Sequence, residues 1–224
     1  MRKSISVLGL GLALAAALFG LTFGGPRLRF WQRMTGTGLA LGGLALAAGP
    51  ELRRTRIGWR DLWLGLSSAG LLYGLFHLGD RIASRLLPTG SQDIQSIYRL
   101  NQLRPRAELI ARLSLIIAPA EELFWRGFLQ KGLMARFGRL RGGAMAAASY
   151  GAVHLPSRNL TLIGAASVVG AFWGGMLALG APLGALIVSH VVWDNLIFLF
   201  APTSGGRVGS HQTPGPLKGL GPPD

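Results

Sequence analysis

The sequence predicts an all-α protein, a polytopic bundle of about seven transmembrane helices. Three observations support this fold class: half of the 224 residues are hydrophobic, only 14% are charged, and the mean hydropathy is +0.40. Values of this kind are typical of integral membrane proteins. The chain has no cysteine, which excludes disulfides and thiolate metal sites.

The apolar runs define the predicted helices, because a membrane-spanning helix needs about 20 mostly apolar residues. The second and fifth runs are short, but their glycines and alanines permit close packing against neighbours. The predicted spans are residues 5–24, 36–50, 62–79, about 107–135, 141–155, 160–179 and 182–201. We therefore expect one integral membrane domain over residues 1–201, with its motifs in 106–200, and a disordered polar tail over 202–224.

Two segments have more than one interpretation. Arg2 and Lys3 precede the first apolar run, as in a signal peptide, but the run is long and lacks a clear cleavage site. We expect a retained helix, with a cleaved signal peptide as the alternative. Residues 92–103 place several apolar side chains near one face, which predicts a short amphipathic helix at the membrane interface. A solvated connector is the alternative.

The net charge of +14 comes largely from basic clusters between the apolar runs, such as residues 26–29 and 53–56. Clusters at such positions normally contact anionic lipid headgroups. No nucleic-acid-binding motif accompanies them, so nucleic acid is not an expected partner. Basic residues flank the spans on both sides and assign no orientation. We expect an integral protein of the plasma (inner) membrane.

Three ionisable residues interrupt the fourth apolar run: Glu121, Glu122 and Arg126. Each costs about 2.5 kcal/mol or more at mid-membrane depth, so such residues usually face a protein interior or a water-filled cavity. Glu122 and Arg126 are four apart and share a helix face, which favours an ion pair. Glu121 points about 100° away and remains available to accept a proton from water. We therefore expect Glu121 to be catalytic and Glu122 to be structural; a purely structural ion-pair cluster is the alternative.

Pro119 lies two residues before Glu121. Inside a helix, proline removes one hydrogen bond and clashes with the preceding turn. We expect a kink or a new helical segment there, with backbone polar groups opened near the carboxylates. In lipid, such groups are tolerated where they line a cavity or are covered by protein.

Two later apolar runs each contribute a histidine at helical spacing to another polar residue. Tyr150 and His154 are four apart, as are His190 and Asp194, and Asn195 follows directly. Asp194 could fix the tautomer of His190, or both side chains could face a cavity. A single histidine on an apolar helix is often structural, but carboxylates and imidazoles that converge within a membrane protein favour hydrolytic chemistry.

Together these motifs resemble those of the CAAX prenyl protease and bacteriocin-processing family of intramembrane proteases, also called CPBP or Abi. In that family the patterns EExxxR, FxxxH and Hxxx(N/D) lie in this order on separate transmembrane helices. The resemblance covers about residues 106–200, and a tyrosine stands where phenylalanine is usual. The matching residues are Glu121, Glu122 and Arg126, then Tyr150 and His154, then His190 and Asp194.

The resemblance implies hydrolysis of a peptide bond within or beside the membrane. In this scheme Glu121 activates the attacking water and His154 assists it. His190 and Asp194 would bind the water or stabilise the tetrahedral oxyanion, which is often the largest catalytic effect. Residues expected to support the site are Glu122, Arg126, Tyr150 and Asn195.

The same residues allow two schemes for a cofactor. Glu121, His154 and His190 match a catalytic zinc ligand set, with water in the remaining position. A metal-free scheme uses the glutamate to activate water and the imidazoles as donors. We favour the metal-free scheme, with a single divalent metal, zinc, as the alternative.

Two other functions compete with proteolysis: a non-catalytic membrane scaffold or immunity protein, and a proton-coupled transporter. The transporter would predict paired halves with broken helices, and no internal repeat is evident in the sequence. The expected partner is a membrane-associated peptide or protein substrate. Prenylated CAAX proteins, bacteriocin leader peptides, peptide pheromones and membrane-anchored regulators all remain open.

Overall fold

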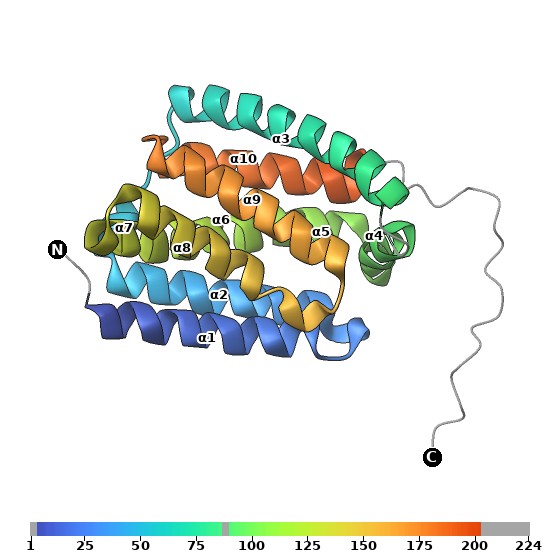
Figure 1. The fold of residues 1–224 in the computed structure, drawn as a ribbon, viewed down its shortest axis with the longest axis horizontal. Helices are drawn as coiled ribbons and strands as arrows, with labels where there is room; N and C mark the ends of the chain where they lie inside the picture. The colour runs from blue at the N-terminus through green and yellow to red at the C-terminus, as the bar shows by residue number, and fades with distance from the viewer. Residues whose placement is uncertain (1–3, 87–89, 203–224) are drawn as a thin grey trace, which may run out of the picture.

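The protein is helical throughout the part of the chain that the structure, a computed structural model, describes: residues 4–86 and 90–202, with no β-strand in these ranges. This confirms the predicted all-α class. The helices lie roughly side by side in a bundle (Figure 1). Nearly all of the predicted disordered tail lies outside the described residues.

Each of the seven apolar runs overlaps a helical stretch, although the second and fifth runs continue past the ends of their helices at Ala48 and Ala152. Within residues 4–86 and 90–202, four helices are long and apolar enough to cross a membrane by length and composition: α1, most of α3, α9, and α10 with its continuation to Phe200. The second helix begins earlier than predicted and the third extends further at both ends. The bounds are α1 (Ile5–Phe23), α2 (Phe30–Ala48), α3 (Trp59–Leu86), α8 (Arg139–Ala152), α9 (Leu160–Ala178) and α10 (Leu183–Asn195).

The fourth run forms one continuous helical stretch in which two segments are π-helical. Pro119 does not break it; instead, widened turns flank the short α-helical segment that carries the two glutamates. Single widened turns of this kind are frequent at functional sites, because they change the direction of nearby side chains. In chain order the segments are α5 (Arg106–Arg112), the π-helical Leu113–Ile117, α6 (Ala118–Glu122), the π-helical Leu123–Gln130 and α7 (Lys131–Phe137).

The connector between the third and fourth runs is a short amphipathic helix, α4 (Gly90–Arg99), followed by a 3-10 turn. Ile94 is buried, and Asn159 donates a hydrogen bond to the backbone oxygen of Asp93 (3.0 Å). The indole of Trp31 donates to the Leu100 oxygen in the following turn (2.8 Å). The helix is therefore anchored to the bundle, and the solvated connector was the wrong alternative.

Glycines in the first half of the chain let two helices approach the motif-bearing segments closely. A Cβ at Gly42 of α2 would lie 2.9 Å from the Cβ of Ala120, the residue before Glu121. A Cβ at Gly65 of α3 would lie 2.6 Å from the side chain of Val188 in α10. Small residues at such crossings are typical of packed membrane helices.

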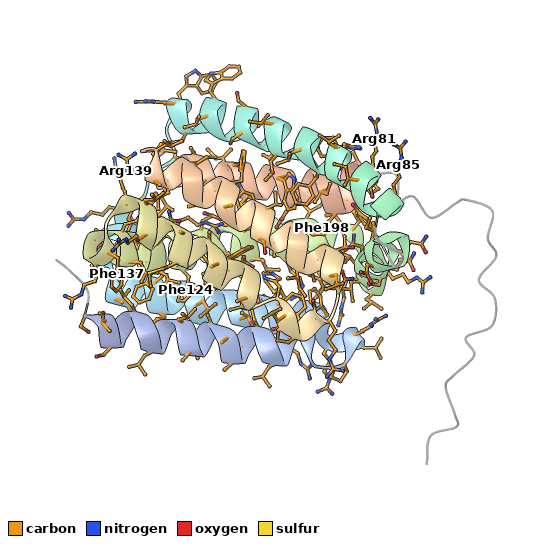
Figure 2. The ribbon with its side chains drawn as sticks, in the orientation of Figure 1. Arg81, Arg85, Phe124, Phe137, Arg139 and Phe198 are labelled. Carbon is orange, nitrogen blue, oxygen red and sulfur yellow. The ribbon has the colours of Figure 1, made fainter. Side chains whose placement is uncertain are left out.

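Basic side chains mark both ends of the bundle (Figure 2). Arg139 extends outward at one end, and Arg81 and Arg85 extend outward at the other, whereas Phe124 and Phe198 lie among the helices. A cationic rim at each end of an apolar bundle suits contact with headgroups on both membrane surfaces.

Candidate active site

Glu121 and Glu122 are both buried in α6, with 3% and 0% of their surface exposed. Glu122 Oε1 accepts a hydrogen bond from Arg126 Nη1 at 2.9 Å, so the ion pair predicted from spacing is present. The same oxygen lies 2.8 Å from His190 Nδ1 on α10. Glu122 thereby joins the motif-bearing helix to α10.

Glu121 has a different partner. The Tyr150 hydroxyl on α8 donates a hydrogen bond to Glu121 Oε2 at 2.7 Å. The two adjacent acids are therefore held in different ways, as their spacing predicted: Glu122 by cationic and imidazole groups, Glu121 by a neutral hydroxyl. Tyr150 brings that hydroxyl directly to the carboxylate proposed as the base.

His154 follows the end of α8 and is 6% exposed. Its Nδ1 lies 2.8 Å from the backbone oxygen of Tyr150. A carbonyl oxygen can only accept, so this contact assigns the proton to Nδ1 and leaves Nε2 as an acceptor in the neutral ring. The rings of Phe19 and Phe23 on α1 each have their centroid 5.2 Å from that of His154.

His190 is oriented by Glu122 rather than by Asp194. Its Nε2 lies 3.6 Å from Asp194 Oδ2, which is beyond ordinary hydrogen-bond length. Of the two alternatives for this pair, the geometry therefore favours the one in which both side chains face a cavity. The indole of Trp173 on α9 stacks on the imidazole, with ring centroids 4.0 Å apart and planes inclined by 27°.

Arg126 is 2% exposed and is enclosed by groups from three helices. Its guanidinium carbon lies 4.8 Å from the centroid of the Tyr150 ring and 5.3 Å from the Trp173 ring. Its Nη2 also donates to the Val169 backbone oxygen at 3.4 Å. Aromatic faces attract a buried cation, so Arg126 holds α8 and α9 around the acids.

Asn195 bonds to the π-helical segment that precedes the glutamates. Its Nδ2 donates to Ser114 Oγ at 3.0 Å and to the Val191 backbone oxygen at 2.7 Å. Ser114 lies in the π-helical segment that precedes the glutamates. The bond to Ser114 therefore links α10 to that segment.

All three motifs contribute to one cavity of about 540 Å³. The polar groups from the motifs that line it are Glu121, Tyr150, His154, His190 and Asp194. Most of the remaining wall is apolar. A largely apolar cavity with a few convergent polar groups is the usual form of a binding or catalytic site.

The comparison with protein families agrees with this geometry. The family model described as type II CAAX prenyl endopeptidase Rce1-like matches residues 105–196, which contain all three motifs. Over these residues, the chain is similar to the CAAX protease family. Neither the comparison with curated proteins nor that with solved structures gave a significant match.

Members of the CAAX protease family are membrane proteases, and the apolar helices described above agree with an integral membrane protein. The family match begins at the start of α5 and ends at Leu196, just past α10. Helices α1 to α4 lie outside it, although α1 and α2 contact the site directly. The contribution of these earlier helices is therefore visible only in the structure.

The sequence left two schemes open for Glu121, His154 and His190, one with a zinc ion and one without a metal. Among the described residues, no group of three or more His, Cys, Asp or Glu side chains is placed so that it could hold a metal ion. Glu121, His154 and His190, the set considered from sequence, each have a hydrogen bond to another residue: Tyr150 binds the first two, and Glu122 binds the third. Both histidines are bonded through Nδ1, which is compatible with metal binding through Nε2. The mechanism proposed below uses these side chains without a metal.

Sequence reasoning did not identify two kinds of contact. Trp173 carries no motif signal, and its stacking on His190 depends on how α9 crosses α10. Phe19 and Phe23 belong to an apolar run whose side chains look alike in the sequence. Their place beside His154 is a consequence of tertiary packing alone.

Proposed function

We propose that this protein is an intramembrane endopeptidase that hydrolyses a peptide bond of a membrane-associated protein or peptide. The observation that carries the proposal is the convergence of Glu121, His154, His190 and Asp194 on one cavity of about 540 Å³. Their burial among apolar helices supports chemistry below the membrane surface.

In the proposed mechanism, Glu121 is the general base. It takes a proton from a water molecule as the water oxygen bonds to the substrate carbonyl carbon. It then returns that proton to the amide nitrogen as the carbon–nitrogen bond breaks. General acid–base catalysis of this kind contributes about 10²- to 10⁴-fold in rate.

The Tyr150 hydroxyl bonds only one oxygen of the base, Oε2, at 2.7 Å. The bond fixes the orientation of the carboxylate. His154 assists through Nε2, because its Nδ1–H is used by the Tyr150 carbonyl. A neutral Nε2 accepts a hydrogen bond from the same water and helps to orient it.

His190 is proposed to stabilise the oxyanion that forms on the substrate carbonyl oxygen, and Asp194 lies beside it in the cavity. Glu122 holds His190 through Nδ1, which leaves Nε2 to face the substrate. In the protonated imidazole, Nε2–H donates to the oxyanion of the tetrahedral intermediate. Asp194 Oδ2 lies 3.6 Å from that nitrogen, too far to take its proton in a hydrogen bond, so the Nε2–H stays available to the substrate.

The membrane placement is part of the proposal. Arg53, Arg54, Arg56 and Arg60 lie beside Trp59 and Trp63, whose side chains are 72% and 59% exposed. Exposed tryptophans next to arginines are typical of a membrane–water interface that contains anionic headgroups. We propose the plasma (inner) membrane as its location, because anionic headgroups there would suit these side chains.

Substrate trapping tests the function. The Glu121→Ala variant is expressed in cells in place of the wild-type protein, and the membrane peptides that accumulate uncut are identified by mass spectrometry. We expect full-length substrates that purified wild-type protein then cleaves. Cleavage undiminished by the substitution would remove Glu121 from the mechanism and favour a non-catalytic scaffold.

A further inference from the structure

Trp173 completes a closed set of contacts in the site, although it belongs to none of the three motifs. Glu122 Oε1 accepts a hydrogen bond from Arg126 Nη1 at 2.9 Å and lies 2.8 Å from His190 Nδ1. The indole of Trp173 stacks on His190 with ring centroids 4.0 Å apart, and its centroid lies 5.3 Å from the guanidinium carbon of Arg126. Each of these four side chains therefore contacts two of the others, and Trp173 is the one that α9 supplies.

The indole of Trp173 is itself held in place. Its Nε1 donates a hydrogen bond to Ser189 Oγ at 3.0 Å, and Ser189 directly precedes His190 in α10. The ring of Trp193 packs edge-on against the indole, with centroids 5.8 Å apart and planes inclined by 83°. Trp173 and Ser189 are both 0% exposed. The indole therefore has little freedom to turn, and its face stays against the imidazole.

The bond to Glu122 alone does not fix the plane of the His190 ring. A hydrogen bond tolerates a range of angles and weakens steeply only below about 120°, so the ring could tilt while that bond is kept. The ring torsion of histidine is also broad. Such a tilt would change the direction of Nε2, the nitrogen proposed to donate to the oxyanion. Asp194 does not prevent this, because it lies 3.6 Å from Nε2. The stacked indole, inclined by 27° to the imidazole, opposes the tilt.

We propose that Trp173 is a positioning residue for the hydrolysis: its indole fixes the plane of the His190 imidazole, so that Nε2 points at the carbonyl oxygen of the bond to be cut. The inference rests on the proposed function, which gives the Nε2–H its target. Misplacement of a catalytic group by 1 Å can cost about 10²-fold in rate. Trp173 also lines the cavity, so direct contact with the substrate is the competing role.

Steady-state kinetics on full-length protein in lipid nanodiscs, with a substrate identified by trapping, test the inference first. Trp173→Leu removes the stacked ring and should lower kcat about 30-fold at unchanged KM. Trp173→Phe keeps an aromatic face on the imidazole and should keep kcat within about threefold of wild type. Leu72→Ala is the control for lost packing, since Leu72 on α3 is 0% exposed and does not line the cavity. It should lower the melting temperature and leave kcat unchanged.

The same substitution in a second background shows whether Trp173 acts through His190. His190→Ala alone should lower kcat by about 10²-fold, because it removes the donor to the oxyanion. With that donor absent, Trp173→Leu should change the remaining rate by less than about twofold. A general loss of structure would instead lower the rate in both backgrounds.

Solid-state NMR in lipid bilayers tests the positioning without any cleavage. The protein is labelled with ¹³C and ¹⁵N in its four histidines, and the signals of His190 are those absent from the His190→Ala spectrum. Dipolar couplings then report the motion of its ring. We expect a restricted ring in wild type and in Trp173→Phe, and large-amplitude motion in Trp173→Leu.

Three results would overturn the inference. The His190 ring could stay restricted in Trp173→Leu, or that substitution could slow the His190→Ala protein as much as it slows wild type. It could also raise KM at unchanged kcat, which would make Trp173 a direct contact of the substrate. A failure of the proposed hydrolysis would be recognised separately, because the trapping experiment would yield no substrate while the NMR comparison would still decide whether Trp173 fixes the ring.

Discussion

The first three helices and the segment from residue 105 onward contribute to the site in different ways. Helices α1 to α3 meet the later helices through close-packed glycines, as where Gly42 lies against Ala120, through aromatic rings and through a few hydrogen bonds such as that from Arg112 to Thr35. The later helices carry the buried acids, imidazoles and arginine, which are bonded to one another across helices. The family match covers only this later part. The early helices therefore supply the shape of the site, and the later ones supply its chemistry.

The largest effect is expected in the later part, from Glu122→Gln. The neutral amide leaves the buried Arg126 without a carboxylate and weakens the bond to His190. Breaking a buried ion pair by removing one partner costs about 3–5 kcal/mol. We expect a large fall in the melting temperature in detergent and loss of cleavage.

A matched substitution in a partly exposed ion pair shows how much of the expected loss of stability is due to burial. Glu108 and Arg112 form an ion pair of similar length (2.8 Å) and the same spacing, but their side chains are 31% and 23% exposed. Glu108→Gln should cost less than about 1 kcal/mol, because exposed pairs contribute little. Equal losses in the two variants would contradict the distinct role assigned to Glu122.

A smaller effect is expected in the early part, from Gly42→Ala. The new methyl group would lie 2.9 Å from the Cβ of Ala120 and would push α2 away from the segment that carries Glu121. Overpacking of this kind costs about 1–3 kcal/mol. Gly43→Ala, which has nothing within 4 Å of the added Cβ, is the control. The melting temperature and the cleavage rate should both fall in Gly42→Ala and stay unchanged in Gly43→Ala.

Tyr150→Phe should change the rate with little change in stability. It removes the hydroxyl that holds Glu121 and introduces the residue that is usual at this position in the family. Losing one hydrogen bond to a charged group is worth about 1.5–3 kcal/mol, so we expect kcat to fall about tenfold or more at unchanged KM. Tyr73→Phe removes a comparable hydroxyl bond, to the Ala201 oxygen, and should leave kcat unchanged. Equal kcat values for wild type and Tyr150→Phe would rule out the positioning role.

The smallest effect is expected from removing metal ions. The proposed mechanism uses no metal, so dialysis of the purified protein against a strong chelator should change the cleavage rate by less than about twofold. Elemental analysis of the same sample reports any tightly bound metal. Activity lost to the chelator and restored by added zinc would contradict the metal-free mechanism.

The later part of the molecule could be predicted from sequence because its signals are local. Glu122 and Arg126 are one turn apart on one helix, so their pairing follows from spacing alone. The bond between Glu122 and His190 could not be derived in this way, since it joins residues 68 positions apart and depends on how two helices cross. Sequence spacing instead suggested Asp194 as the residue that orients His190, because Asp194 is the nearest acid along the chain.

The early part was predictable only as a set of apolar runs. Their lengths gave the helices, but nothing in the run around Phe19 indicates which side chain meets His154. Pro119 illustrates a different limit. Its expected effect was a kink or the start of a new helical segment. The α-helical segment α6 does begin at Ala118, with Pro119 in its first turn, but the π-helical segments on both sides of α6 have no signal in the sequence.

A double-mutant cycle between Glu121 and His154 tests the central claim most directly, because the two residues come from different helices and are proposed to act on one water. With a trapped substrate and purified proteins, we expect Glu121→Gln to lower kcat/KM by about 10³-fold and His154→Ala by about 10²-fold. If they act as a unit, the double variant should be no slower than Glu121→Gln alone. If the effects of the two substitutions multiply to about 10⁵-fold in the double variant, or if Glu121→Gln is fully active, the claim that both residues act on one water is contradicted.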